Sequence, residues 1–253
     1  MMEGRPAARL YVPDDLGPGL SFDLSAGQAH YLRNVLRLTV GAEIAPFNGR
    51  DGEWQGRIDR IGKGGCSVSL GGRTRPQTTE PDLWLVFAPV KRARIDYLVE
   101  KATELGVAEL YPVRTQRTVV ERVNIERLQA NAVEAAEQTE RLAVPTVHAP
   151  ESLPALIARW PAGRRLIVCD ERGRAPPIAQ TIGSLRDTLS AGAAVLIGPE
   201  GGFTETELDG LANLPFASPV SLGPRVLRAD TAALAALAVF QAVAGDWRKD
   251  RAG

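Results

Sequence analysis

The sequence predicts an α/β protein in which a helix-covered parallel sheet follows a small antiparallel unit. From residue 83 onward, apolar runs typical of buried strands alternate with segments of helical periodicity. Before residue 72, strand-like runs are separated by NGRDG and GKGG, which favour hairpins. The intervening segment GGRTRPQTTEPD is rich in Gly, Pro and Thr, as linkers are. We therefore expect a first domain over 1–72, a linker over 73–82 and a second domain over 83–249.

One helix stands out in the first domain. Ser25 and Gln28 have capping-box spacing ahead of the segment AHYLRNVLRL. Its apolar positions recur at helical spacing: Ala29, Leu32, Val35 and Leu36. His30, Arg33 and Arg37 then share the opposite side of the helix. This basic face is suited to RNA phosphates, although a solvated surface is the alternative.

The second domain reads as strands and helices in alternation. Strands are expected over 83–90, 107–113, 165–171, 193–198 and 217–223, and helices over 94–106, 125–142, 178–189, from Thr204, and over 230–247. Strands that are apolar throughout their length are typical of a parallel sheet covered on both faces. Ligands of such sheets bind at the carboxyl ends of the strands. The segments IGPEGG and LGPRVLR both fall there.

Composition limits the possible functions. The chain of 253 residues is 44% hydrophobic and 24% charged, with a formal net charge of zero, so a nucleic-acid surface must be a local patch. The longest apolar run, 232–240, is shorter than the roughly 20 residues of a membrane span, and we expect a cytoplasmic protein. Cys66 and Cys169 lie far apart, and His30 and His148 are the only histidines. We therefore expect no disulfide framework and no metal site.

The segment VLIGPEGGFTETEL combines a buried strand, a glycine-rich turn and a helix start. Thr204 and Glu207 have capping-box spacing, which predicts that the helix begins directly after the turn. A phosphate-binding turn needs a nearby Lys or Arg, but this one carries Glu200 instead, and the chain has no GxGxxG motif. The turn therefore suits a neutral or cationic ligand. A tight turn without a ligand is the alternative.

A second loop repeats this design with the opposite charge. In SLGPRVLRADTAALAAL, a strand ends in Gly-Pro ahead of a helix capped by Asp230 or Thr231, and the loop carries Arg225 and Arg228. An acidic and a basic loop at one edge of a sheet fit a cationic cofactor beside an anionic substrate. The alternatives for each arginine are a carboxylate partner or a solvated position.

Five blocks of the sequence, taken in order, resemble one known family. They are HYLRNVLRL, PVKRARIDYLVEKATELGVAELYPVRTQRTVV, EAAEQTER, LIGPEGGFTETEL and SLGPRVLRADTAALAAL. In this order they resemble the RsmE family, SPOUT-class enzymes that use S-adenosylmethionine to methylate N3 of a uridine in 16S ribosomal RNA of the small subunit. The resemblance implies an N-terminal PUA-like β-barrel, a SPOUT-type parallel sheet with a C-terminal trefoil knot, and a homodimer.

The resemblance also implies roles for individual residues. The expected cofactor-binding residues are Ile197, Gly198, Pro199, Glu200, Gly201, Leu222, Gly223, Arg225, Leu227 and Thr231. Arg225 and Arg228 are the expected catalytic residues, because positive charge stabilises the uracil anion that forms when N3 loses its proton. Three acceptors for the N3 proton are considered: Glu200, Asp230 and water. The expected RNA contacts are His30, Arg33, Arg37, Lys91 and Arg92, with Arg94 beside the last two.

The chain departs from the family pattern at two places, and other functions remain open. Thr139 and Glu140 stand where the family has a small residue and a glycine, and LRADTA replaces the usual Leu-Arg-Thr-Glu-Thr-Ala. The alternatives are a non-catalytic RNA-binding or ribosome-assembly factor, and a methyltransferase that acts on ribose 2′-O or guanine N1. The absence of a Walker lysine and of GxGxxG counts against an enzyme that uses a nucleotide phosphate.

Overall fold

The computed structural model describes residues 6–120 and 122–248, and of Arg92 it describes the backbone alone. The chain forms two compact units. The first consists of Met1–Thr79 together with Ala136–Val144, and the second of Glu80–Ala135 together with Pro145–Gly253. In the described part of the chain, no helix is both long enough and apolar enough to cross a membrane.

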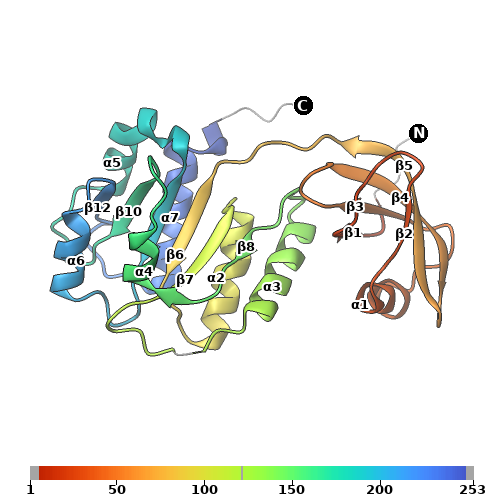
Figure 1. Ribbon diagram of the computed structural model, residues 1–253, viewed down its shortest axis with the longest axis horizontal. Helices are drawn as coiled ribbons and strands as arrows, with labels where there is room; N and C mark the ends of the chain where they lie inside the picture. Colours follow the sequence, from red (N-terminus) through yellow and green to blue (C-terminus); the bar gives the residue numbers. More distant parts are fainter. Residues whose placement is uncertain (1–5, 121, 249–253) are drawn as a thin grey trace. The chain divides into compact units, whose positions relative to one another are not determined.

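A five-stranded sheet in the order β1-β3-β4-β5-β2 forms the first unit (Figure 1). Its strands are β1 (Arg9–Tyr11), β2 (Ser21–Asp23), β3 (Glu43–Phe47), β4 (Glu53–Gly62) and β5 (Gly65–Arg75). All pairings are antiparallel except that of β1 with β3. The turn signals NGRDG and GKGG connect β3 to β4 and β4 to β5, as expected. Strand β5 runs to Arg75, three residues into the segment 73–82 that the sequence predicted as a linker.

The helix of the first unit begins as expected but ends early. α1 (Ala26–His30) starts with both hydrogen bonds of the capping box between Ser25 and Gln28. The chain then forms a π-helical turn, η1 (Tyr31–Val35), and Arg37 has a left-handed φ of 55°. A left-handed residue cannot continue a right-handed helix. The expected single helical face from His30 to Arg37 is therefore wrong, because Arg37 lies beyond the helix end.

Arg9 ties residues 136–144 to the sheet of the first unit. These residues are the last turn of α3 (Ile125–Gln138) and the segment that follows it. The guanidinium of Arg9 donates to three carbonyl oxygens there, at 2.8–3.0 Å, and pairs with Glu53 at 2.6 Å. It also lies 4.4 Å from the centroid of the Phe47 ring. Arg9 thus satisfies carbonyl groups that a helix leaves without partners at its C-terminus.

Glu140 adopts a left-handed conformation directly after α3, with a φ of 61°. Glycine takes this conformation without steric cost, which accounts for the glycine of the family pattern at this position. The carbonyl oxygen of Glu140 accepts a hydrogen bond of 2.9 Å from Arg75 on β5. The turn therefore has the backbone form that glycine favours, with a glutamate in that place.

The second unit contains a seven-stranded sheet in which every pairing is parallel. The order is β12-β10-β11-β6-β7-β8, and β9 pairs with β7. The strands are β6 (Leu83–Phe87), β7 (Glu109–Arg114), β8 (Thr146–Val147), β9 (Glu151–Ser152), β10 (Arg165–Cys169), β11 (Ala193–Ile197) and β12 (Ala217–Val220). The predicted α/β class with a parallel sheet is confirmed.

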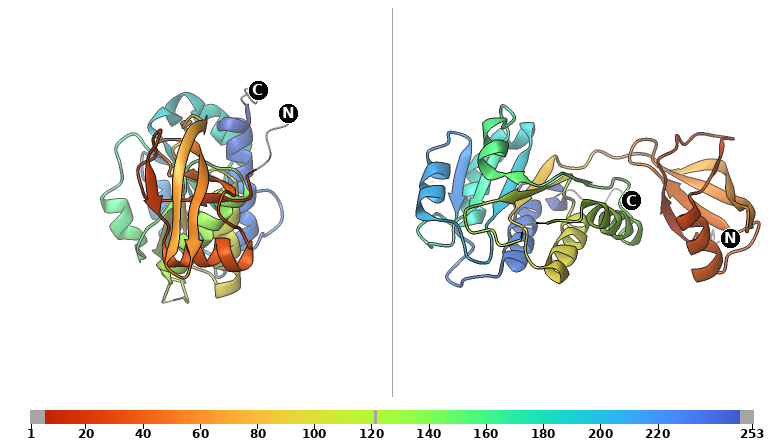
Figure 2. Two further views of the ribbon diagram at one scale, coloured as in Figure 1. Left: turned by 90° about the vertical axis from the view of Figure 1, so that its right-hand side faces the viewer. Right: turned by 60° about the horizontal axis from the view of Figure 1, so that its bottom comes forward.

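Helices cover both faces of this sheet. Besides α3 they are α2 (Arg92–Glu104), α4 (Leu153–Ala158), α5 (Ile178–Leu185), α6 (Glu205–Ala212) and α7 (Ala229–Val243), with short 3₁₀ helices η2 (Arg186–Ala191) and η3 (Asp246–Arg248). α2 and α7 lie side by side on one face, where α7 contacts β11 (Figure 2, right). α4 and α6 lie on the other face.

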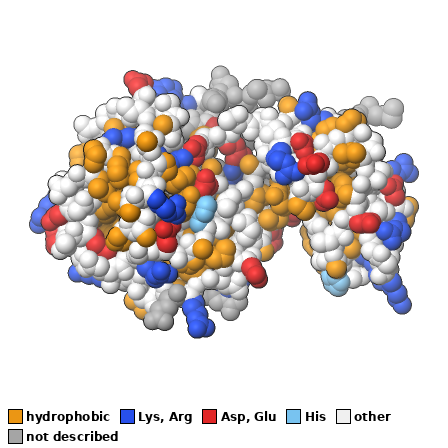
Figure 3. Space-filling model, viewed as in Figure 1, with side chains coloured by type: hydrophobic (Ala, Val, Ile, Leu, Met, Phe, Trp, Pro, Cys, Tyr) orange, Lys and Arg blue, Asp and Glu red, His pale blue; other side chains and the backbone are white. Residues whose placement is uncertain are grey.

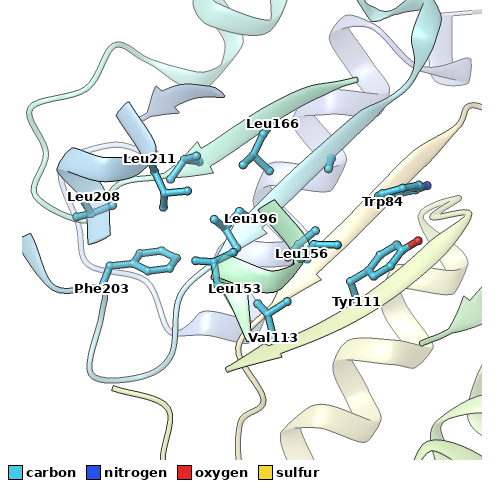
Figure 4. Close-up of a cluster of buried hydrophobic side chains, with 13 residues drawn as sticks. Trp84, Tyr111, Val113, Leu153, Leu156, Leu166, Leu196, Phe203, Leu208 and Leu211 are labelled. Atoms are coloured by element: carbon cyan, nitrogen blue, oxygen red, sulfur yellow. The ribbon is translucent and has the colours of Figure 1, made fainter. Parts of the chain in front are cut away.

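A cluster of thirteen buried hydrophobic side chains lies between the sheet and helices α4 and α6 (Figure 4). The strands β6, β7, β10 and β11 each contribute alternate residues to it, as a pleated strand requires. Leu196 lies in this cluster, is 0% exposed and is next to the end of β11. The core therefore holds the ends of these strands in fixed positions.

Leu196→Ala tests how far this core stabilises the second unit. We expect the free energy of unfolding to fall by about 2–5 kcal/mol, because the substitution leaves a cavity in a packed core. Chemical denaturation followed by circular dichroism measures the change. Gln180→Ala is the matched control at an exposed position of α5 and should stay within about 0.5 kcal/mol of the wild type. An equally small change for Leu196→Ala would contradict the described packing.

Candidate functional site

A cavity of about 900 Å³ lies at the carboxyl ends of β10, β11 and β12. Cavities that bind small ligands measure about 300–1,000 Å³. Three loops line this one: residues 169–173 after β10, residues 197–200 and 202 after β11, and residues 221–228 after β12. α2 contributes Arg94, and α7 contributes Ala229 and Ala232. Because the three strands are parallel neighbours, their following loops meet at one edge of the sheet.

The glycine-rich loop after β11 is held in a tight form. Gly202 has a φ of 68°, and a Cβ atom on Gly198 would lie 2.8 Å from the Phe203 ring. The predicted capping box is confirmed: Thr204 Oγ1 accepts the Glu207 N–H at 3.2 Å, and Glu207 Oε2 accepts the Thr204 N–H at 2.9 Å. α6 therefore begins directly after the loop, and the loop backbone can approach a ligand closely.

The loop after β12 supplies the positive charge. Gly223 has a φ of 104°, and its N–H donates to Ser221 Oγ at 3.2 Å. Arg225 and Arg228 are exposed and line the cavity. Within the described ranges, neither guanidinium forms an ion pair. Both are therefore available to an anionic group in the cavity.

The loop after β10 is held by a network of charges around Arg172. Arg172 pairs with Asp170 at 2.8 Å and with Glu205 and Asp209 of α6, each at 2.9 Å. Burial raises the pKa of the Asp170 carboxyl, but hydrogen bonds from Arg172 outweigh burial and leave this pKa below its ordinary value. Asp170 is therefore ionised at neutral pH. Burial also raises the pKa of the neighbouring Cys169 thiol to about 12, so this cysteine is not a nucleophile.

A further ion pair lies at the cavity. Arg94, in the first turn of α2, donates to Glu200 Oε1 at 3.0 Å, and both side chains are partly exposed. A pair in this environment contributes little to stability. It does leave Glu200 with a cationic neighbour, which the sequence did not predict. In the described segments, no group of three His, Cys, Asp or Glu side chains has the arrangement of a metal site.

Most of the predicted cofactor residues lie together at this cavity. The lining includes Ile197, Gly198, Pro199, Glu200, Leu222, Gly223, Arg225 and Leu227. Gly201 and Thr231 do not line it. The Thr231 N–H instead meets the carboxylate of Asp230 at 3.0 Å, and Asp230 also lies outside the lining.

The predicted RNA contacts lie at the surface of the units that carry them. His30, Arg33 and Arg37 are exposed on the first unit, where His30 Nδ1 is 2.7 Å from Asn34 Nδ2. Lys91 is exposed at the N-cap of α2, and the side chain of Arg92 lies outside the described residues. Figure 3 shows positive and negative side chains interspersed on the viewed face, without a broad field of one sign.

Sequence reasoning missed the third loop of the cavity. Asp170 and Glu171 were placed at the end of the strand predicted over 165–171, with Arg172 directly after it, but β10 ends at Cys169 and all three lie in the loop. The rule that directed attention to the other two loops applies equally to this one, so charged residues at the carboxyl end of β10 were an available signal. The contacts of Arg94 and Arg117 with the glycine-rich loop span 106 and 84 residues, and no local pattern predicts them.

Comparisons with known proteins agree with this architecture. The family model described as RNA methyltransferase domain matches residues 78–241, and the one described as RNA methyltransferase PUA domain matches residues 24–71. The ribosomal RNA small subunit methyltransferase E of Rickettsia conorii is 32% identical over 231 residues, which cover 91% of this chain and 93% of that protein. That of Synechocystis is 31% identical and covers 94% of this chain and 78% of the relative.

Solved structures of similar proteins contain a cofactor. The ribosomal RNA small subunit methyltransferase E of Neisseria gonorrhoeae, bound to S-adenosylmethionine, has a TM-score of 0.84 and 28% identity over 95% of this chain and 99% of that one. A Legionella pneumophila methyltransferase in complex with the same cofactor has a TM-score of 0.82 and 29% identity over 96% and 100%. On these matches, the chain belongs to the RsmE family of ribosomal RNA small subunit methyltransferases, with an N-terminal PUA-like domain.

Proposed function

We propose that this protein uses S-adenosylmethionine to methylate N3 of a uridine in 16S ribosomal RNA of the small ribosomal subunit. The observation that carries the proposal is the cavity at the ends of β10, β11 and β12, with a glycine-rich wall and an arginine-bearing wall. Family membership and the cofactor bound by the similar structures support it. The site of action is then the cytoplasm, where small subunits are assembled.

The residues of the cavity fit S-adenosylmethionine. Three carboxylates, of Asp170, Glu171 and Glu200, line the cavity; Arg172 pairs with Asp170, Arg94 pairs with Glu200, and Glu171 accepts the Phe203 N–H. This part of the lining therefore does not repel a positively charged sulfur as the unpaired lysine of a phosphate site would. Of the residues predicted to hold it, Gly198, Pro199 and Gly223 offer backbone, and Ile197, Leu222 and Leu227 offer apolar surface to an adenine ring. When bound, this cofactor supplies a methyl group on a positively charged sulfur. The glycines thus allow a close approach of backbone and do not serve to neutralise a phosphate.

Arg225 and Arg228 prepare the uracil for reaction. N3 of uridine carries a proton, and its lone pair is delocalised, so the proton must leave before or while N3 attacks a methyl group. A guanidinium beside the uracil oxygens stabilises the negative charge that then develops. Both arginines line the cavity without an ion pair among the described residues, which makes them available for this role.

The geometry favours Glu200 over Asp230 as the acceptor of the N3 proton. Glu200 lines the cavity, whereas Asp230 lies outside the lining and accepts the Thr231 N–H. Glu200 is also paired with Arg94, so it can accept a proton only where that pair opens or adjusts. Proton loss to water is the competing route, and a Glu200→Gln variant distinguishes the two through the pH dependence of turnover.

We propose that the exposed basic residues outside the cavity bind RNA phosphates. On the first unit these are His30, Arg33 and Arg37, and on the second unit Lys91 and Arg92. Phosphate contacts of this kind fix the position of an RNA without reading its sequence. Base recognition then falls to the cavity, which the target uridine can enter only when it is unpaired or flipped out.

We further propose that the first unit closes as a β-barrel, that the second unit carries a trefoil knot, and that the protein is a homodimer. Family membership supports all three. The homodimer is also supported by α7, where Leu234 and Val239 are only half-buried. Tyr97 of α2, the helix that packs against α7, is 46% exposed. These apolar side chains would be buried in a subunit interface.

Mass spectrometry of ribosomal RNA tests the proposed reaction. Small subunits from cells that lack the gene should gain one N3-methyluridine after incubation with the purified protein and S-adenosylmethionine. Methylation of a ribose 2′-O or of guanine N1 would contradict the proposed atom but keep the enzyme class. Cofactor binding without any methylation of subunits or RNA would favour the RNA-binding or assembly factor.

Single alanine variants test the two arginines. Arg228→Ala and Arg225→Ala should each lower turnover by about 10²–10³-fold, the typical cost of removing a group that stabilises an oxyanion, while the melting temperature stays close to the wild type. Arg186→Ala, at an exposed position outside the cavity, is the control and should keep full turnover. Wild-type turnover of both cavity variants would contradict the assignment.

Light scattering tests the homodimer. The chain mass is 27.1 kDa, and the wild type should elute with twice that mass. Leu234→Glu places a charge at a half-buried position of α7 and should elute as a monomer of unchanged helix content, because burying an unpaired charge in an interface is costly. A wild type with the mass of a single chain would contradict the proposal.

A further inference from the structure

A carboxylate from the loop after β10 holds the glycine-rich loop from one side. Glu171 Oε1 accepts the backbone N–H of Phe203 at 2.7 Å. A Cβ atom on Gly202 would overlap this same carboxylate oxygen, so the contact requires a glycine at position 202. Gly202 also has a left-handed φ of 68°. The conformation of the loop and the position of Glu171 are therefore matched to one another.

A guanidinium holds the same loop from a different strand end. Arg117 follows β7, and its Nη1 donates to the carbonyl oxygens of Gly201 at 3.0 Å and Phe203 at 3.2 Å. The neighbouring Gln116 N–H donates to Glu207 Oε1 at 2.8 Å, which ties this segment to the first turn of α6. Hydrogen bonds to charged groups are the stronger ones in proteins.

The hydrogen bonds of Glu171 and Arg117 do not occupy the loop residues that line the cavity. The backbone groups that they engage belong to Gly201 and Phe203, which do not line the cavity. The residues between and before them, Gly198, Pro199 and Gly202, do line it. Glu171, which itself lines the cavity, and Arg117 thus engage backbone groups of residues outside the lining, while Gly198, Pro199 and Gly202 face the cavity.

We propose that Glu171 and Arg117 are positioning residues for the cofactor, which fix the glycine-rich loop in its binding form before the ligand arrives. The inference rests on the proposed function of the cavity as the cofactor site. A short loop rich in glycine loses more backbone freedom on ordering than other sequences do. Contacts that order it in advance remove this cost from ligand binding.

Calorimetry with S-adenosylhomocysteine tests this role. Glu171→Ala and Arg117→Ala should each raise the Kd about tenfold, which is the loss expected for one charged hydrogen bond. Glu171→Gln should stay within about twofold of the wild type, because the amide oxygen still accepts the Phe203 N–H. The double alanine variant should also lose only about tenfold, because both residues hold the same loop.

Steady-state kinetics separates positioning from catalysis. Both alanine variants should raise the KM for S-adenosylmethionine and keep the wild-type kcat at saturating cofactor, because a bound cofactor orders the loop in either case. Arg159→Ala is the matched control. It removes an exposed charged contact with Glu151, both residues lie outside the cavity lining, and it should change neither constant.

Three results would overturn the proposal. If Glu171→Gln bound S-adenosylhomocysteine as weakly as Glu171→Ala, the carboxylate would act on the ligand by its charge. Alanine variants that bind like the wild type would mean that the loop needs neither contact. Losses that multiply to about a hundredfold in the double variant would mean that the two residues act separately. A wild type that does not bind S-adenosylhomocysteine would instead overturn the proposed function, and this inference with it.

Discussion

The parallel pairing of β10 with β11 and β12 is the constraint on which the site depends. Parallel neighbours end at the same edge of a sheet, so the three loops that follow them must meet. Buried side chains on both faces of the sheet fix the ends of these strands. Leu196 and Val168 are among those that are fully buried. The cavity is therefore a consequence of strand order and core packing, and its chemistry comes from the loop residues together with Arg94 of α2.

Each of the three loops contributes a different property to the cavity. The loop after β11 brings backbone close to the ligand, because Gly198 and Gly202 leave no room for side chains. The loop after β12 provides two arginines that form no ion pair among the described residues, and the loop after β10 provides the buried carboxylate of Asp170 and the exposed one of Glu171. Opposite charges can coexist in one cavity because Arg172 neutralises Asp170 and Arg94 neutralises Glu200. Arg225 and Arg228 are left for an anionic substrate, which fits a reaction that generates negative charge on a base.

The sequence predicted the parts of this structure that depend on local patterns. Capping boxes at Ser25 and Thr204 marked two helix starts correctly, since their hydrogen bonds join residues three positions apart. The buried strands were evident because residues covered on both faces are apolar throughout. The π-helical turn and the left-handed Arg37 were not evident, because the segment has the apolar spacing of an ordinary α-helix.

Contacts between distant segments could not be predicted in this way. Arg9 meets carbonyl groups 127–132 residues away, and this contact brings residues 136–144 into the first unit. Glu171 and Arg117 reach the glycine-rich loop across 32 and 84 residues, so their role follows only from the folded arrangement. Glu140 was predictable in part. The family pattern indicated a glycine at this position, and the left-handed backbone of the folded chain supplies the reason.

A crystal structure of the protein grown with S-adenosylhomocysteine tests the central claim most directly. The account predicts ligand density in the cavity between residues 198–202 and 221–228, with the glycine-rich loop in the conformation described here. An empty cavity in crystals that hold the ligand elsewhere on the molecule would contradict it.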